Sequence, residues 1–359
     1  MSKRFKATMV FVLTLTLYLS GCGLFGEDEK KKLDPPEEVS QLEEGESVET
    51  SDSTDDDSVT SSMDESSEKV MTELYLIDEN GYVVSQTLPL PKTESVAKQA
   101  VEHLVTNGPV SNILPNGFRA VLPADTTVDV NIKTEDKMAV VDFSTEFGNY
   151  EAEDEEKILQ AVTWTLTQFE NVEKVEFRVN GYPLTEMPVN GTKISPDGLS
   201  RSMGINIDPE GVIDISNSRQ LTVYYLAQNE GSMYYVPVTK RVSNIEGSNI
   251  NAVVAELIKG PSYSSNLVSE FFPDVELLDT PTVKDGEVTL NFNEAIYGSF
   301  EEKMISTELL NSLVLSLTEQ TNIKKVSVLV NGEGEIVNEQ GESLSEPVTR
   351  PEKVNTVSF

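Results

Sequence analysis

Apolar residues recur at helical spacing in four separate stretches of the chain. Residues spaced i, i+3, i+4 and i+7 lie on one face of an α-helix, so this spacing predicts amphipathic helices packed on a core. Two of the stretches end in Gly-Pro, where glycine permits a left-handed cap and proline prevents continuation. The four sets are Val96, Ala100, Val101, Leu104 and Val105; Ile158, Leu159, Val162 and Leu166; Ile250, Val253, Val254, Leu257 and Ile258; and Leu309, Leu310, Leu313 and Leu317.

Short runs of β-branched and aromatic residues lie between these helices and predict strands. Two of them alternate, wholly or in part, and stop at Asn-Gly, which is a strong turn signal. The runs are Leu74–Leu76, Ala139–Phe143, Val175–Val179, Val223–Tyr225, Val288–Phe292 and Val326–Val330.

The same order of elements occurs twice, which indicates a tandem duplication. Val175–Gly181 and Val326–Gly332 are 151 positions apart, and both copies end in an irregular tail that runs through an Arg to Ile205-Asn206 or Val354-Asn355. We predict two copies of one α+β domain, with helices packed on a mostly antiparallel sheet. Copy 1 spans residues 72–206 and copy 2 spans residues 219–359, with a connector at 207–218. Each copy is long enough to own a core and is expected to fold alone.

The chain begins with the pattern of an exported lipoprotein. Basic residues precede an apolar run from Ala7 to Leu19, which is shorter than the roughly 20 residues that span a bilayer. The run ends in Leu19-Ser20-Gly21-Cys22, which resembles a bacterial lipobox. That resemblance implies a signal peptide at 1–21, cleavage before Cys22 and attachment of diacylglycerol to its thiol. Cys22 is the single cysteine, so no intramolecular disulfide can form.

An acidic segment follows the leader, and we expect residues 22–71 to form a lipidated, disordered tether. The net charge of the whole chain is -34, and residues 27–69 hold 17 acids, 4 bases and no aromatic residue. Such a segment buries too little apolar surface to offset its chain entropy. The remaining residues are also acidic, which makes nucleic acid a poor partner.

Catalytic or cofactor chemistry finds little support in the sequence. With one histidine, His103, neither a histidine-based triad in both copies nor a multi-histidine metal site is available. We expect His103 to face solvent, Trp164 to lie in or beside the core, and no cofactor to bind. A group of four tyrosines in copy 2 is best explained as side chains that face one another across a hairpin. The alternative is a surface that binds sugar or a partner. The four are Tyr224, Tyr225, Tyr234 and Tyr235.

Acidic residues offer two further hypotheses. A cluster at residues 151–156 suits a helix N-terminus, although Asp154 to Glu156 could hold Ca²⁺ weakly. Asp142 and Glu146 could serve an enzyme as a carboxylate pair, but copy 2 has Asn291 and Ala295 at these positions, although Glu294 stands one position away. The loss of the pair in one copy favours a binding module over an enzyme.

These features together resemble the GerM family of sporulation and germination lipoproteins, which carry tandem GerMN domains. The resemblance rests on Leu257–Pro261, on Ala139–Phe147, on the paired Asn-Gly strand ends and on the lipobox. This sequence departs from the family's pattern in copy 1, where one extra residue precedes Gly108-Pro109. The family's domains resemble small ring-building α+β domains.

The resemblance implies a structural role at the outer face of a membrane, in the space between mother cell and forespore. The implied partners are membrane lipid, through acylated Cys22, and the transenvelope complex, with peptidoglycan as a further candidate. The expected protein is therefore not an enzyme. The alternative is a cell-wall enzyme or peptidoglycan-binding module that uses surface carboxylates or tyrosines.

Overall fold

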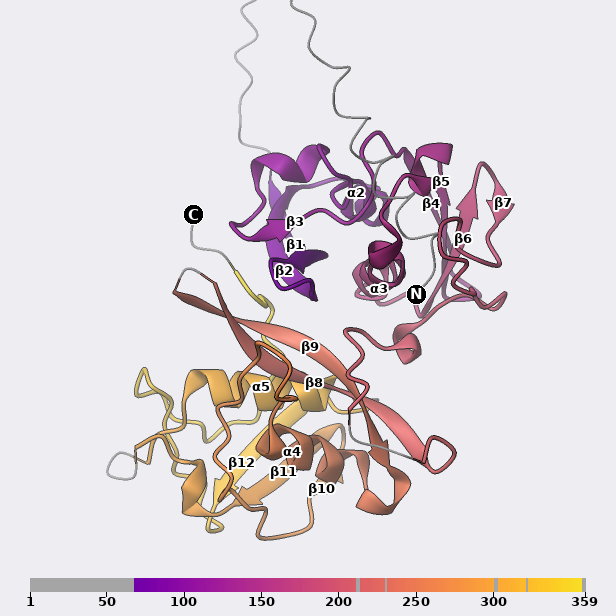
Figure 1. Ribbon diagram of the computed structural model, residues 1–359. Coiled ribbons are helices and arrows are strands. Elements are labelled where there is room, and N and C mark those ends of the chain that lie inside the picture. Colours follow the sequence, from indigo (N-terminus) through magenta and orange to yellow (C-terminus); the bar gives the residue numbers. More distant parts are fainter. Residues whose placement is uncertain (1–67, 211–213, 230, 300–302, 321, 357–359) are drawn as a thin grey trace, which may run out of the picture. The chain divides into compact units, whose positions relative to one another are not determined.

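The computed structural model describes residues 68–356 except 211–213, 230, 300–302 and 321 (Figure 1). The predicted signal peptide, Cys22 and nearly all of the predicted tether lie outside the described residues. The last three residues assigned to the tether, 69–71, belong to strand β1, so the folded part begins slightly earlier than predicted. Within the described ranges, no helix is long and apolar enough to cross a membrane.

Copy 1 contains seven strands and two α-helices, in the order that the sequence predicted. A hairpin of two long strands is followed by a helix, then by a second sheet with a helix inserted between its middle strands. The elements are β1 (Lys69–Asp78), β2 (Val83–Pro91), α2 (Val96–Glu102), β3 (Phe118–Arg119), β4 (Val128–Lys133), β5 (Met138–Phe143), α3 (Glu155–Leu166), β6 (Lys174–Val179) and β7 (Tyr182–Pro183), with a 3-10 turn, η4, at Arg201–Met203.

Copy 2 repeats this arrangement. A longer hairpin again precedes a helix and a four-stranded sheet that is interrupted by a second helix. The elements are β8 (Ser218–Asn229), β9 (Ser232–Ser243), α4 (Asn249–Lys259), β10 (Thr282–Lys284), β11 (Glu287–Phe292), α5 (Thr307–Thr318), β12 (Lys325–Val330) and β13 (Val348–Thr349).

Each copy holds two sheets that are antiparallel except for one parallel pair. In copy 1 the orders are β2-β1-β3 and β4-β5-β6-β7, and in copy 2 they are β8-β9 and β10-β11-β12-β13. Strands β5 and β6 are parallel, as are β11 and β12, because α3 and α5 carry the chain back between them. The fold is α+β, as predicted.

The predicted apolar positions form two main cores. Side chains at the helical positions of α3 and α5 are at most 6% exposed, including Leu166 and Leu313. Each helix also fastens the first strand of its own copy: Tyr75 N donates to Thr165 Oγ1 (3.0 Å), and Tyr224 N donates to Ser316 Oγ (2.8 Å). The cores are not fully separate, because Val84 of β2 packs in the core of copy 2.

The two Gly-Pro helix ends differ. Gly260 has φ +80° and caps α4 as predicted. In copy 1 the left-handed residue is Asn107 (φ 60°), and Gly108 is extended at φ -84°. The extra residue before Gly108 moves the left-handed position one step upstream, so the predicted role of Gly108 was wrong.

Candidate functional site at the junction of the two copies

Each copy ends in a tail that pairs with the hairpin of the other copy. Ile205 N donates to Thr239 Oγ1 (2.8 Å), and Thr239 N donates to Ile205 O (2.9 Å). Reciprocally, Val354 N donates to Thr87 Oγ1 (3.0 Å), and Thr87 N donates to Val354 O (3.2 Å). Thr87 and Thr239 occupy equivalent positions on β2 and β9, so the exchange follows a pseudo-twofold relation.

The asparagine that ends each tail bridges the two hairpins. Asn206 Oδ1 accepts from Val83 N, and its Nδ2 donates to Val83 O and Pro237 O, all at 2.8 Å. Asn355 repeats this pattern with Tyr235 N (2.7 Å), Tyr235 O (2.8 Å) and Ser85 O (2.8 Å). Both asparagines have positive φ, 45° and 54°, which asparagine tolerates better than most residues. These side chains replace the water that would otherwise satisfy the backbones of β2 and β9.

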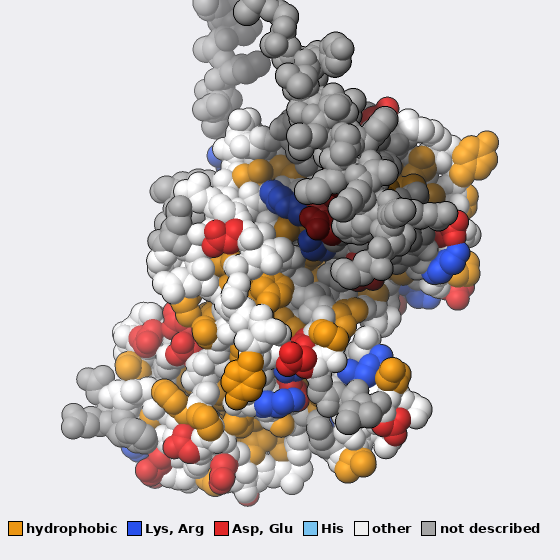
Figure 2. Space-filling view, in the orientation of Figure 1, with side chains coloured by type: hydrophobic (Ala, Val, Ile, Leu, Met, Phe, Trp, Pro, Cys, Tyr) orange, Lys and Arg blue, Asp and Glu red, His pale blue; other side chains and the backbone are white. Residues whose placement is uncertain are grey.

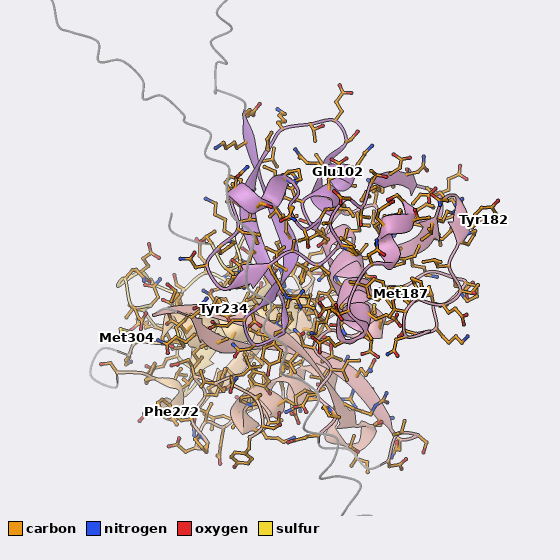
Figure 3. All side chains as sticks on the ribbon, turned by 45° about the horizontal axis from the view of Figure 1, so that its top comes forward. Glu102, Tyr182, Met187, Tyr234, Phe272 and Met304 are labelled. Atoms are coloured by element: carbon orange, nitrogen blue, oxygen red, sulfur yellow. The ribbon has the colours of Figure 1, made fainter. Side chains whose placement is uncertain are left out.

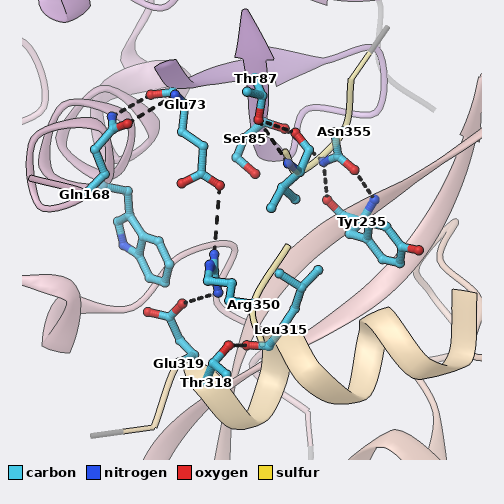
Figure 4. Close-up of polar contacts among 12 residues, drawn as sticks. Glu73, Ser85, Thr87, Gln168, Tyr235, Leu315, Thr318, Glu319, Arg350 and Asn355 are labelled. Carbon is cyan, nitrogen blue, oxygen red and sulfur yellow. Dashed lines mark hydrogen bonds and ion pairs between the residues drawn. The ribbon is translucent and has the colours of Figure 1, made fainter. Parts of the chain in front are cut away.

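A polar cluster of four charged residues lies beside the tails, and Figure 4 shows three of them, Glu73, Glu319 and Arg350. Arg201 Nη1 donates to Glu319 Oε1 (2.8 Å), and Arg350 Nη1 lies 3.5 Å from Glu319 Oε2. Arg350 Nη2 also lies 3.9 Å from Glu73 Oε1 across the junction. The Glu319 side chain is 9% exposed, whereas each arginine side chain is 27% exposed. The two positive and two negative charges balance, which limits the cost of burying them.

Aromatic rings form the floor of this cluster. The Arg201 guanidinium lies 4.5 Å from the centroid of the Trp164 ring, and that of Arg350 lies 5.5 Å from the Tyr224 ring. Tyr224 OH donates to Glu319 Oε2 (3.1 Å) and accepts from Arg350 Nη2 (3.2 Å). Cations over aromatic faces gain electrostatic energy, most strongly where water is excluded.

The electrostatics of the cluster keep Glu319 ionised. Burial alone would raise the pKa of Glu319, but the guanidinium groups of Arg201 and Arg350 lower it below its ordinary value. Burial raises the pKa of the Tyr224 hydroxyl, and the neighbouring carboxylate of Glu319 raises it further. The cluster is therefore a fixed structural network rather than a group poised to exchange protons near neutral pH.

Further contacts join the copies away from the cluster. Tyr234 OH donates to Asp78 Oδ2 (2.8 Å), and Phe118 lies edge-on to Tyr234 with ring centroids 5.3 Å apart. Burial raises the pKa of Asp78, although hydrogen bonds from Tyr234 and Tyr82 oppose the shift. The predicted connector also contacts copy 2 at its start: Lys240 Nζ lies 3.5 Å from Asp208 Oδ2, so this part of the connector packs on β9.

The structure corrects the prediction for His103 and confirms that for Trp164. His103 is 7% exposed, with Nδ1 2.8 Å from Gln99 O, so the predicted solvent-facing position was wrong. Its equivalent in copy 2, Glu256, is also buried, because this face of each first helix packs inward. Trp164 is fully buried, as predicted.

The four tyrosines are structural but do not face one another. Tyr224 and Tyr225 stand opposite Pro237 and Val236, while the residues opposite Tyr234 and Tyr235 are Ala227 and Leu226. Three of the four tyrosines are at most 5% exposed, and Tyr235 is partly buried. The hairpin register separates the pairs, so the expectation of facing tyrosines was wrong.

The candidate carboxylates have local structural partners. Asp142 Oδ1 accepts from Gly181 N (2.9 Å), and Asn291 Oδ1 accepts from Gly332 N in the same way (2.8 Å). Both side chains hold an Asn-Gly turn, which explains why aspartate and asparagine interchange between copies. Glu146 is partly exposed, and a hydrogen bond from Ser144 lowers its pKa.

The acids at 151–156 stand at the start of α3, as predicted. Asp154 is ion-paired with Arg119 (2.8 Å) and Lys157 (2.9 Å). Glu155 is fully buried and accepts from Tyr150 OH (2.6 Å) and the backbone N–H groups of Asn190 (2.6 Å) and Thr192 (2.9 Å). Among the described residues, no group of His, Cys, Asp and Glu has the arrangement of a metal site.

The sequence shows that an arginine and an asparagine recur in both tails, but it did not predict a function for them. The signal was their repetition within otherwise irregular segments, where nothing local requires an arginine. The role of Glu319 was harder to predict from the repeat, because the equivalent residue in copy 1 is Gln168.

Comparisons of the chain with known protein families and solved structures agree with this fold and its duplication. A family model described as "Germane: Sporulation and spore germination" matches residues 73–185 and 222–335, which together exceed half of the chain. The chain therefore belongs to this family of sporulation and spore germination proteins.

Its similarity to one member extends over almost the full length. The chain is 58% identical to the spore germination protein GerM of Bacillus subtilis (strain 168), over 97% of this chain and 96% of that protein. The solved tandem GerMN domains of B. subtilis GerM match with a TM-score of 0.76 and 62% identity, covering 80% of this chain and all of that one. The expected GerM-family membership and tandem GerMN fold are confirmed.

Proposed function

We propose that this sporulation and germination protein is a lipid-anchored, extracytoplasmic structural module. In this proposal Cys22 carries the lipid, and residues 22–71 hold the two GerMN domains away from the membrane. The domains then act as a non-catalytic scaffold with the transenvelope complex between mother cell and forespore, as the family resemblance implies. Support comes from the lipobox and from the near full-length similarity to a spore germination protein.

The observation that carries the structural role is the reciprocal exchange of tails. Val354 pairs with Thr87 and Ile205 pairs with Thr239, so each copy completes the hairpin region of the other. Two similar domains held in a fixed relation present two similar surfaces at a set spacing. A partner that contacts both gains affinity because the second contact is intramolecular.

The use of Asp142 also favours a scaffold. Its carboxylate holds the Asn-Gly turn after β6, and the copy 2 equivalent Asn291 does the same without a charge. A residue that catalysed glycan cleavage would need an ionisable group and an open approach to substrate. No specific contact in the described residues favours the cell-wall enzyme over the scaffold.

Crosslinking in sporulating cells tests the partner. The lipidated chain is crosslinked during engulfment, purified under denaturing conditions and analysed for attached proteins. Recovery of envelope-complex proteins supports the proposal. In parallel, the soluble part is incubated with peptidoglycan, where release of soluble fragments would establish the enzyme instead, and sedimentation without cleavage would add peptidoglycan as a ligand.

Metabolic labelling with a fatty acid tests the anchor. Replacing Cys22→Ala removes the thiol that accepts diacylglycerol, so we expect the label to disappear and the chain to remain unprocessed or be released. Label retained by the alanine variant would contradict lipidation at Cys22.

A further inference from the structure

A groove lined by aromatic and proline side chains opens beside the end of α4 in copy 2. It has a volume of about 580 Å³ and lies between the Gly260-Pro261 turn and the loop that follows. We call it the aromatic groove, and its apolar lining consists of Ile258, Pro261, Tyr263, Phe271 and Pro273. Phe271 forms part of the buried floor at 5% exposure, whereas Tyr263 is fully exposed.

Two more apolar side chains of the loop that lines the aromatic groove are exposed. Phe272 is 54% exposed and Val268 is 49% exposed, and both lie in the same loop as Tyr263. Hydrophobic side chains interspersed with acidic ones are visible over copy 2 in the lower half of Figure 2, and Phe272 is marked in Figure 3. Soluble proteins seldom gather exposed apolar residues in this way except where they bind something.

At two equivalent positions the first copy has polar residues instead. Val268 pairs with Leu226 as Arg119 pairs with Ile77, so Val268 stands where copy 1 has an ion-paired arginine. Counted from the Gly-Pro turn, Tyr263 corresponds to Ser111. Because the fold is shared, the scaffold itself does not require apolar residues here.

The charge around the aromatic groove is negative. Residues 260–283 include Glu270, Asp274, Glu276 and Asp279 but no lysine or arginine. Two carboxylates balance the two lysines that line the groove. Lys240 Nζ lies 2.9 Å from Glu256 Oε2 and 3.5 Å from Asp208 Oδ2, and Lys259 Nζ lies 2.9 Å from Glu256 Oε1. Glu210 lines the groove, and Glu270 and Asp274 are the chain neighbours of its lining residues Phe271 and Pro273. Acidic side chains at these places attract basic residues and repel the anionic headgroups of a bilayer.

We propose that the aromatic groove binds a segment of a partner protein that carries an aromatic or branched apolar side chain beside lysine or arginine. The apolar side chain enters between Tyr263, Pro261 and Pro273, and the basic residues meet the acids of the 270–279 loop. Aromatic pockets of this kind usually carry much of the affinity of an interface. The inference rests on the proposed scaffold function and assigns its contact to copy 2.

The test begins with the full chain in sporulating cells, in which a benzoylphenylalanine photocrosslinker replaces Tyr263. We expect one dominant crosslinked protein, and we expect the attached peptide to contain an apolar side chain next to lysine or arginine. The same photocrosslinker at Tyr182, which is 78% exposed on β7 of copy 1 (Figure 3), serves as the matched control and should not capture that peptide.

A synthetic peptide of the captured sequence is then titrated against the purified chain. We expect Tyr263→Ser, which installs the residue of copy 1, to weaken binding at least tenfold, and Glu270→Lys with Asp274→Lys to do the same. Tyr182→Ser should leave the affinity unchanged. All of these side chains are partly or fully exposed, and equal melting temperatures confirm that the variants are folded.

Several outcomes would overturn the inference. One is that position 263 gives no crosslink, or that it captures a lipid, a second copy of this chain, or a segment that is acidic or wholly polar. Another is that the peptide binds Tyr263→Ser as tightly as it binds the unchanged chain. Binding of the chain to phosphatidylglycerol vesicles that is abolished by Tyr263→Ser would likewise assign the groove to a membrane. If the photocrosslinker at Tyr182 captures envelope-complex proteins while that at position 263 captures none, the proposed scaffold function is supported and the proposed binding role of the groove is wrong. If neither position captures an envelope protein, the scaffold function fails as well.

Discussion

Gln168 and Glu319 occupy equivalent positions after helices α3 and α5, yet they bind different partners. Gln168 accepts from Glu73 N (3.1 Å) and donates to Glu73 O (2.6 Å), so it fastens β1 within copy 1. Glu319 instead reaches Arg201 of the other copy. The duplication is therefore asymmetric at its junction, where a single carboxylate between two arginines replaces a neutral amide.

Removing the charge of Glu319 should destabilise the whole molecule. Glu319→Gln keeps the size of the side chain but leaves only Glu73 to balance the charges of Arg201 and Arg350. We expect a loss of about 2–4 kcal/mol in the free energy of unfolding, slightly less than for a fully buried pair because each arginine is partly exposed. Urea unfolding measures the effect. Glu333→Gln, which breaks the exposed pair with Lys303, is the control and should cause no measurable change.

The bridging asparagine of copy 2 allows backbone strain to be separated from hydrogen bonding. Asn355→Gly retains freedom at φ 54° but loses three hydrogen bonds, which we expect to cost about 2–3 kcal/mol. Asn355→Ala adds the left-handed penalty of about 1–2 kcal/mol. Asn206→Gly should match Asn355→Gly, because the two side chains make equivalent bonds. An equal effect of glycine and alanine would show that the residue is not held in the left-handed region.

Leu313→Ala tests whether the copies unfold together. Leu313 is fully buried in the core of copy 2, so its truncation should cost about 2–5 kcal/mol. The sequence predicted that each copy folds alone, in which case copy 1 would be barely affected. With Val84 in the second core and the tails exchanged, we now expect one shared transition. Trp164 in copy 1 is the single tryptophan, so its fluorescence should shift with the far-UV circular dichroism. An unchanged tryptophan transition would restore the independent-domain prediction.

The buried carboxylate of Glu155 should make stability depend on acid pH. Burial alone would raise its pKa, but hydrogen bonds from Thr192, Tyr150 and Asn190 lower the pKa to about 2 from an ordinary value of 4.5. A lowered folded-state pKa stabilises the protein above the unfolded-state value, and this contribution is lost as pH falls from 4.5 toward 2. Melting temperatures of the wild type and Glu155→Gln should therefore differ most near neutral pH and converge at low pH. A constant difference across that range would contradict the assignment.

Much of the fold followed from local pattern. The periodic positions of α3 and α5 are buried as predicted, and the Asn-Gly strand ends form turns, because each depends on neighbours a few residues away. Membership of the GerM family also followed from the order of short motifs. The prediction for His103 failed because an isolated helix pattern does not show how many faces of the helix are covered.

The sequence by itself determined the duplication, the elements within each copy and the acidic composition. Only the tertiary structure decided what the irregular tails do. Arg201 and Glu319 are 118 positions apart, and Thr87 and Val354 are 267 apart, so no local spacing encodes their contact. Two similar domains could each have kept its own tail. The choice depends on which arrangement satisfies the backbones of β2 and β9 and neutralises the buried charges, and that is a property of the packed molecule as a whole.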